Sequence, residues 1–179
     1  MKCRRKPSWQ YLVLTMNKRT GIYVHIPFCV NKCHYCDFVS GHRFDLEDKY
    51  FNKLTEEIRG RKDTRKKIQT VYFGGGTPSS VEPQNIRKVL FEIESAFDLS
   101  ELEEMTIEVN PGTCHNDNIR NYYEMGFDRI SIGVQSFNEK MLARIGRIHS
   151  EKEIYKTVEE ARKAGFRNIS IDLMYGLPD

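Results

Sequence analysis

The chain has 179 residues, of which 39% are hydrophobic and 30% are charged, and its formal net charge is +3. This composition is that of a globular domain, no apolar run approaches the roughly 20 residues of a membrane helix, and the charge is too small to indicate a nucleic-acid partner. The cysteines number five, and three of them are clustered, which favours a reducing compartment over a secreted disulfide framework.

Residues 1–20 are predicted to be a basic, disordered extension that precedes the domain. No acidic residue occurs before Asp37, and the apolar patch at residues 11–14 is shorter than a signal-peptide core of about 7 to 15 residues. Met16 is a second candidate start. We therefore expect a cytoplasmic protein, with a mitochondrial location as the alternative because the N-terminus is basic.

A short β-type run at residues 22–26 is stopped by Pro27 and leads into a cysteine cluster. The cluster has the spacing C-x3-C-x2-C and consists of Cys29, Cys33 and Cys36. Three thiolates on one loop indicate a soft-metal site, and an iron–sulfur cluster with one open iron fits their number. A structural zinc site would need a fourth ligand, for which His25 and His34 are the candidates.

Helices and strands alternate along the rest of the chain. A helix with an acidic N-cap at Asp45 is expected to end at Gly60, and a solvated basic loop to cover residues 59–67. Further strands are predicted at 70–73, 105–109, 129–134 and 168–173, and helices at 83–97, 117–125 and 150–164, the last opened by a capping box at 150–153 and closed by Gly165.

This alternation predicts an α/β fold with a parallel sheet, either part of a (β/α) TIM-type barrel or an open doubly wound sheet. About five β/α units do not close an eight-stranded barrel. We therefore interpret residues 21–179 as one incomplete domain, the front part of a larger protein.

Polar and glycine residues gather where the predicted strands end. A glycine turn at 74–77 follows the second strand, the third carries Glu108, the fourth ends at Gln135 and the fifth carries Asp172. Each has a structural explanation by itself, such as a tight turn or a paired core carboxylate. Because barrel enzymes collect function at the C-terminal ends of their strands, the five ends together indicate a ligand site. There the glycines are expected to approach a ligand closely and to offer it N–H donors.

These motifs resemble the radical S-adenosylmethionine (SAM) superfamily, in which C-x3-C-x2-C ends a first strand and a GGGTP turn follows. Five flanking words, from about Gly21 to the end, are similar to the oxygen-independent coproporphyrinogen III oxidase group: YVHIPFC at 23–29, GGGTPS at 74–79, IEVNP at 107–111, IGVQSF at 132–137 and DLMYGLP at 172–178.

The resemblance implies a [4Fe–4S] cluster held by Cys29, Cys33 and Cys36, with SAM on the fourth iron. It also implies which residues contact SAM: Tyr23, Tyr35, Gly75, Gly76, Thr77, Glu108, Gln135, Arg147 and Asp172. Active members of the superfamily cleave SAM to a 5′-deoxyadenosyl radical. The resemblance does not decide whether this chain cleaves SAM or whether it is an enzyme.

One departure from the group's pattern lies at Phe38. The decarboxylating oxidases carry a further cysteine at this position, whereas a phenylalanine is similar to the heme chaperone branch, whose heme-binding motif lies beyond residue 179. The implied partners are heme or a porphyrinogen, an electron donor and a heme-acceptor protein. Two alternatives remain open, an oxidase that makes protoporphyrinogen IX and a non-catalytic metal-binding fragment.

Overall fold

The computed structural model describes residues 19–113 and 116–177. In chain order, its strands and helices are β1 (Gly21–Ile26), α1 (Glu47–Gly60), β2 (Asp63–Lys67), β3 (Thr70–Gly75), α2 (Pro83–Ala96), β4 (Phe97–Asp98), β5 (Glu104–Val109), α3 (Asn116–Glu124), β6 (Arg129–Gln135), α4 (Glu139–Arg144), α5 (Glu151–Ala164) and β7 (Asn168–Leu173). Two short 3-10 turns occupy Phe44–Leu46 and Pro78–Ser80.

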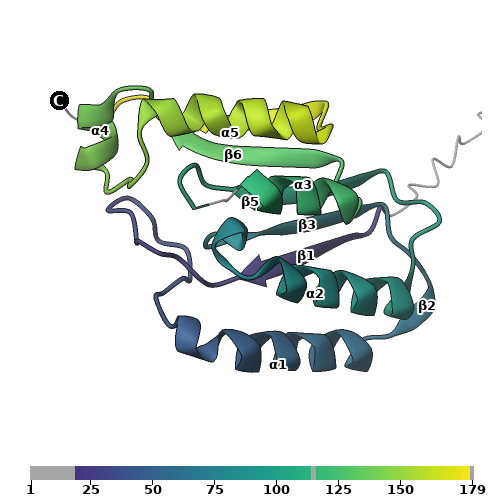
Figure 1. Cartoon of the computed structure of the whole chain (residues 1–179). Coiled ribbons are helices and arrows are strands. Elements are labelled where there is room, and N and C mark those ends of the chain that lie inside the picture. The colour runs from purple at the N-terminus through teal and green to yellow at the C-terminus, as the bar shows by residue number, and fades with distance from the viewer. Residues whose placement is uncertain (1–18, 114–115, 178–179) are drawn as a thin grey trace, which may run out of the picture.

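The main sheet has five parallel strands in the order β1-β3-β5-β6-β7. Each new strand is added beside the previous one, and helices α1, α2, α3 and α5 cover one side of the sheet (Figure 1). A doubly wound sheet would reverse its direction of growth from an inner strand. The order therefore confirms the prediction of a partial (β/α) barrel, and it brings the C-terminal ends of all five strands to one edge.

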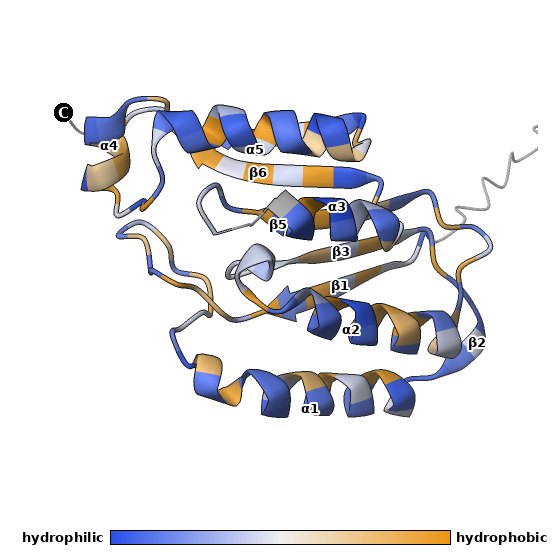
Figure 2. Ribbon diagram, in the orientation of Figure 1, coloured by the Kyte–Doolittle hydropathy of each residue, from blue (hydrophilic) through white to orange (hydrophobic). Residues whose placement is uncertain are grey.

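The two faces of the sheet differ in polarity because successive side chains of a strand point to opposite sides. Apolar side chains face the helices and form the core, among them Val24, Ile26, Val71, Phe73, Ile107, Ile130 and Ile132. Hydrophobic and hydrophilic residues alternate along these helices (Figure 2), as a helix covering a sheet requires. The opposite face of the sheet carries polar residues such as Tyr72, Glu108, Ser131 and Asp172.

Two local expectations were wrong, and one helix was missed. Asp45 does not cap α1, because its carboxylate pairs with Arg43 at 2.7 Å and the N-cap position is taken by Leu46. The predicted basic loop at 59–67 contains strand β2, which pairs with the two-residue strand β4 while its side chains stay exposed. Helix α4 was not predicted; Asn138 caps it by accepting hydrogen bonds from the backbone N–H groups of Lys140 and Met141.

The expectations for α5 are confirmed. Ser150 and Glu153 form both hydrogen bonds of the capping box, and Gly165 ends the helix in the left-handed conformation with a φ of 116°. The predicted N-terminal extension falls almost wholly on residues 1–18, which lie outside the described residues. Within the described ranges, no helix combines the length and apolar character needed to span a membrane.

Candidate functional site

The three cysteines lie on a loop that connects β1 to the start of α1, at the edge where the parallel strands end (Figure 1). Two backbone hydrogen bonds close the base of this loop, from Cys29 N–H to the Gly41 carbonyl at 3.0 Å and from Gly41 N–H to the Pro27 carbonyl at 2.9 Å. A tight turn brings Cys36 N–H within 3.1 Å of the Cys33 carbonyl. All three thiols are free.

The tip of the cysteine loop rests on the segment that follows α4. The Asn31 side-chain amide donates to the Gly146 carbonyl at 2.7 Å, and His34 N–H donates to the Ile145 carbonyl at 3.0 Å. The His34 ring nitrogen Nδ1 donates to the Arg144 carbonyl at 2.9 Å. Helix α4, which the sequence did not predict, therefore supports the loop that carries the thiols.

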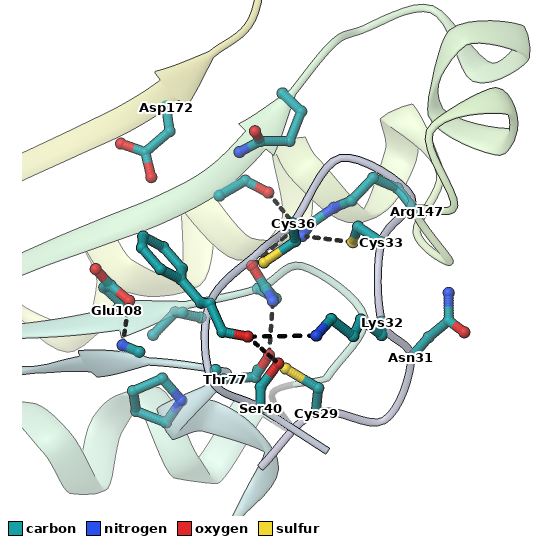
Figure 3. Close-up of a pocket in the computed structure, with 18 of the residues that line it drawn as sticks. Cys29, Asn31, Lys32, Cys33, Cys36, Ser40, Thr77, Glu108, Arg147 and Asp172 are labelled. Carbon is teal, nitrogen blue, oxygen red and sulfur yellow. Dashed lines mark hydrogen bonds between the residues drawn. The ribbon is translucent and has the colours of Figure 1, made fainter. Parts of the chain in front are cut away.

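A cavity of about 180 Å³ lies between the cysteine loop and the ends of the strands (Figure 3). It is lined by the three cysteines and by all but one of the residues expected to contact SAM, namely Tyr35, Gly75, Gly76, Thr77, Glu108, Gln135, Arg147 and Asp172. Tyr23 is the exception. Its ring stacks on Tyr72 with centroids 6.0 Å apart, and it lines a neighbouring pocket.

The glycine turn has little space for side chains. Gly75 adopts a φ of +114°, and a Cβ there would lie 2.5 Å from the His25 ring. At Gly76 a Cβ would lie 2.7 Å from the Phe28 carbonyl oxygen and 3.1 Å from the Cys29 sulfur. Glycine is thus needed for the close approach of this turn to β1 and the cysteine loop.

The expectation that this turn offers N–H donors to a ligand is wrong. Gly76 N–H donates to the Ile26 carbonyl at 2.8 Å, and Thr77 N–H donates to the Phe28 carbonyl at 2.7 Å. Gly75 N–H is taken by a Glu108 carboxylate oxygen at 3.1 Å. These donors fasten the glycine turn to β1, β5 and the cysteine loop, so a ligand would meet its carbonyl groups and the Thr77 hydroxyl.

Asn110 connects the strand ends to two of the thiols. Its amide nitrogen donates to the Thr77 hydroxyl oxygen at 2.9 Å, which leaves the hydroxyl hydrogen for the Cys29 sulfur at 3.4 Å. Its amide oxygen accepts from Arg147 Nη2 at 2.8 Å, while Arg147 Nη1 donates to the Cys33 sulfur at 3.7 Å. Hydrogen bonds to sulfur favour the thiolate and tune the potential of an iron–sulfur centre. Asn110 was not among the predicted site residues.

Several polar groups that line the cavity have a fixed protonation state or a hydrogen-bond partner. Burial raises the pKa of Tyr35 to about 12, against the opposing charge of Arg147, so its hydroxyl remains a donor at neutral pH. The Glu108 carboxylate accepts from the Tyr72 hydroxyl at 2.7 Å, and burial together with this bond raises the pKa of Tyr72. Ser131 donates to Asp172 at 3.4 Å.

Comparison with known proteins identifies the family of this site. A model of the radical SAM superfamily matches residues 23–179. The chain belongs to the radical SAM superfamily. It is 42% identical to the heme chaperone HemW of Lactococcus lactis and 39% identical to that of Escherichia coli, over 91% and 89% of this chain.

One structural relative is also close in sequence. The coproporphyrinogen III oxidase HemN of Escherichia coli matches with a TM-score of 0.82 and 32% identity over 89% of this chain and 38% of that chain. The two chaperones are each covered over 43% of their length, so this chain spans less than half of the curated relatives it matches. The hydrogenase maturase HydG, at 15% identity and a TM-score of 0.59, shares the fold.

Membership of the radical SAM superfamily implies a [4Fe–4S] cluster and SAM, and the chemistry of the residues that line the cavity suits both. The described residues contain no group of three or more His, Cys, Asp or Glu side chains placed around one metal ion. A cubane cluster does not require such a group, because each thiolate binds a different iron. Free thiols line one cavity, and two of them receive hydrogen bonds. The buried Arg147 Nε has no hydrogen-bond partner in the described structure, and a bound carboxylate would supply one.

Proposed function

We propose that this chain is the cluster- and SAM-binding core of a heme chaperone that delivers heme to acceptor proteins. The proposal is supported by the similarity to the two heme chaperones named above and by one residue of the cysteine loop. That residue is Phe38, which stands where the resembling oxidases carry an additional cysteine. Its side chain is 65% exposed and lines the cavity, so the cluster side of the cavity presents an apolar ring at this position.

In this proposal, Cys29, Cys33 and Cys36 hold the cluster, whose open iron supplies the site for the amino and carboxylate groups of SAM. The Arg147 guanidinium provides the charge and the spare Nε–H for the SAM carboxylate. Glu108 and Asp172 offer carboxylate oxygens to the ammonium group or to ribose hydroxyls. Tyr23 stays a predicted SAM contact, although it does not line the cavity.

The rival function is oxidation of coproporphyrinogen III to protoporphyrinogen IX. The structural match to HemN favours it, because the two folds agree over most of this chain. The identity to the chaperones, 42% for the Lactococcus lactis protein against 32% for HemN, and the phenylalanine at position 38 favour the chaperone. We expect an electron donor in either case. For the chaperone we further expect a heme-acceptor partner and a cytoplasmic location.

The two functions are separated by one experiment on the protein that carries this chain. It is reconstituted anaerobically with iron and sulfide, reduced, and given SAM with coproporphyrinogen III or, in parallel, with heme. We expect heme binding, seen as a Soret band that remains with the protein on gel filtration, and no protoporphyrinogen IX by chromatography. Formation of protoporphyrinogen would contradict the chaperone proposal. The variant Phe38→Cys tests the position itself and is expected to keep the cluster without gaining oxidase activity.

A further inference from the structure

A second cavity, separate from the cluster cavity, lies between the cysteine loop and the first two turns of α1. Its volume is about 450 Å³. Five of its lining residues are apolar or aromatic, namely Pro27, Phe28, Val39, Leu46 and Tyr50. Phe28 is 4% exposed and meets the Tyr50 ring edge-on at 5.5 Å, whereas the Val39 side chain is 78% exposed. The cavity is therefore a groove with an aromatic floor and an open apolar edge.

Three cationic side chains surround this groove. They are Arg43 on the loop and Lys49 and Lys53, one turn apart on α1, and no Asp or Glu is among the lining residues. Arg43 pairs with Asp45 at 2.7 Å and Lys53 with Glu56 at 2.6 Å, but these pairs are exposed and such pairs exchange at little cost. Lys49 forms no ion pair with any described residue. An apolar floor beneath cations suits an apolar molecule that carries carboxylates.

The groove is built from the same loop as the cluster site. Phe28 in its floor directly precedes Cys29, and Ser40 lines both cavities. The Val39 carbonyl at its edge accepts a hydrogen bond from the His25 ring at 2.8 Å, which fixes this part of the loop against β1. Only residues of the cysteine loop would therefore separate a ligand in the groove from the thiols.

We propose that this groove binds a flat tetrapyrrole carboxylate, with the ring on the aromatic floor and its carboxylates on Lys49 and Arg43. The proposal rests on the heme-handling function proposed above and adds a binding site within this chain. Two carboxylates at the rim of a flat ring can pair with cations from two elements, Arg43 on the loop and Lys49 on α1. An acyl chain has one carboxylate and would leave the aromatic floor largely uncovered.

The lining residues offer no axial ligand to a heme iron. None of them is His, Cys or Met, and the Tyr50 hydroxyl already donates to the His25 carbonyl. Burial raises the pKa of Tyr50, so its phenol stays protonated at neutral pH. The ring is therefore held by apolar contacts and by its carboxylates, and a metal-free ring should bind as well as heme.

The test uses the 179-residue chain with its reconstituted cluster, titrated with protoporphyrin IX by fluorescence anisotropy and with heme by absorbance. We expect the two dissociation constants to agree within about threefold. Lys49→Glu should weaken both by about tenfold, which corresponds to about 1.4 kcal/mol, and Val39→Asp should weaken both similarly. Lys152→Glu is the matched control, because it makes the same charge change at an exposed position of α5 and should leave both constants unchanged.

Three outcomes would overturn the groove proposal. If neither Lys49→Glu nor Val39→Asp alters porphyrin binding, the ligand binds elsewhere. Displacement of protoporphyrin by palmitate at equal concentration indicates an acyl-chain groove. Absence of porphyrin binding by a chain that holds its cluster refutes the site, while the chaperone function is judged separately by heme binding and oxidase activity of the protein that carries this chain. Iron content and thermal melting of each variant show that a lost signal is not lost folding.

Discussion

The two walls of the cluster cavity are built in different ways. The cysteine loop is irregular, two of its three thiols are only partly buried, and its tip is held by three hydrogen bonds to the last residue of α4 and the two residues after it. The opposite wall is formed by the ends of parallel strands, where Thr77 and Gln135 are buried and the glycine turn is fastened by its own N–H groups. Register and burial therefore fix the strand-end wall, whereas the tip of the cysteine loop depends on a few exposed contacts.

This difference suits the two walls to different functions. A wall fixed by the sheet can present Glu108, Asn110 and Asp172 at constant positions, which suits recognition of a ligand. A loop tip with few supports can close around a cluster as it is loaded, and the bonds to the cluster then hold the tip in place. Substitutions in the loop should thus alter cluster retention, and substitutions in the strand-end wall should alter stability and SAM binding.

The largest effect is expected from Cys33→Ala. Removal of one thiolate leaves a cluster with two protein ligands, so we expect the reconstituted chain to lose its brown colour and nearly all of its iron and sulfide. Iron and sulfide analysis after anaerobic reconstitution measures this. The control Cys3→Ala changes a cysteine outside the motif and should keep the cluster. Binding of stoichiometric zinc without sulfide by the unaltered chain would instead support the metal-binding fragment.

Gly76→Ala tests the fixed wall. The new Cβ would lie 2.7 Å and 2.9 Å from the backbone oxygens of Phe28 and Ile26, so the turn must move away from the cysteine loop. We expect a loss of about 1–3 kcal/mol in the free energy of unfolding and at least tenfold weaker SAM binding, measured by denaturation and calorimetry. Gly60→Ala is the matched control, because nothing lies within 4 Å of its added methyl group. Equal effects of the two substitutions would refute the steric account.

A histidine packed against the end of β6 should also make the fold sensitive to acid. Burial, with the nearby charge of Arg147, lowers the pKa of His149 from 6.5 to about 4, against opposing contributions from the Val134 carbonyl and Glu153. Between these values the unfolded chain binds a proton that the folded chain does not, so stability falls as the pH is lowered through this window, by at most about 3 kcal/mol. His149→Gln should remove this part of the slope in denaturation measured from pH 7 to pH 4.5. An unchanged slope would contradict the assignment.

Tyr72→Phe should have a smaller effect on the same wall. The variant removes the 2.7 Å hydrogen bond to Glu108 but leaves the one from Gly75 N–H at 3.1 Å. We expect a loss of about 1–2 kcal/mol in the free energy of unfolding and SAM binding weakened several-fold, with iron and sulfide content unchanged. Tyr155→Phe, on exposed α5, removes a hydroxyl from a side chain that is 61% exposed and serves as the control.

The sequence predicted the regular part of this molecule better than its irregular part. Strands such as 70–73 and helices such as 150–164 follow from local apolar spacing and caps, and the alternation of the two predicted the parallel sheet. The strand-end residues could be predicted because the ends of parallel strands meet at one edge of the sheet, independently of the conformation of the loops. The same local reasoning failed at β2, whose residues DTRKK have no strand preference and pair only because β4 lies beside them.

Contacts between distant segments could not be predicted locally. Asn110 meets Thr77 and Arg147 across separations of 33 and 37 residues, and no local pattern encodes such pairings. The N–H groups of the glycine turn were wrongly predicted to donate to a ligand. Their actual acceptors, the carbonyls of Ile26 and Phe28, lie about 50 residues earlier and could not be recognised from the local sequence. Helix α4 has only six residues, too few to show a period.

The smallest effect is expected from Asn31→Ala, which removes one support of the cysteine loop. Asn31 is exposed, so loss of its 2.7 Å bond to the Gly146 carbonyl should change the free energy of unfolding by about 1 kcal/mol or less. Because the tip of the loop has few other supports, we expect a chelator to remove the cluster about threefold faster, as measured by visible absorbance. Val30→Ala, an exposed neighbour in the same loop, should lose its cluster at the original rate. If both variants behaved alike, support of the loop by the segment after α4 would not govern cluster retention.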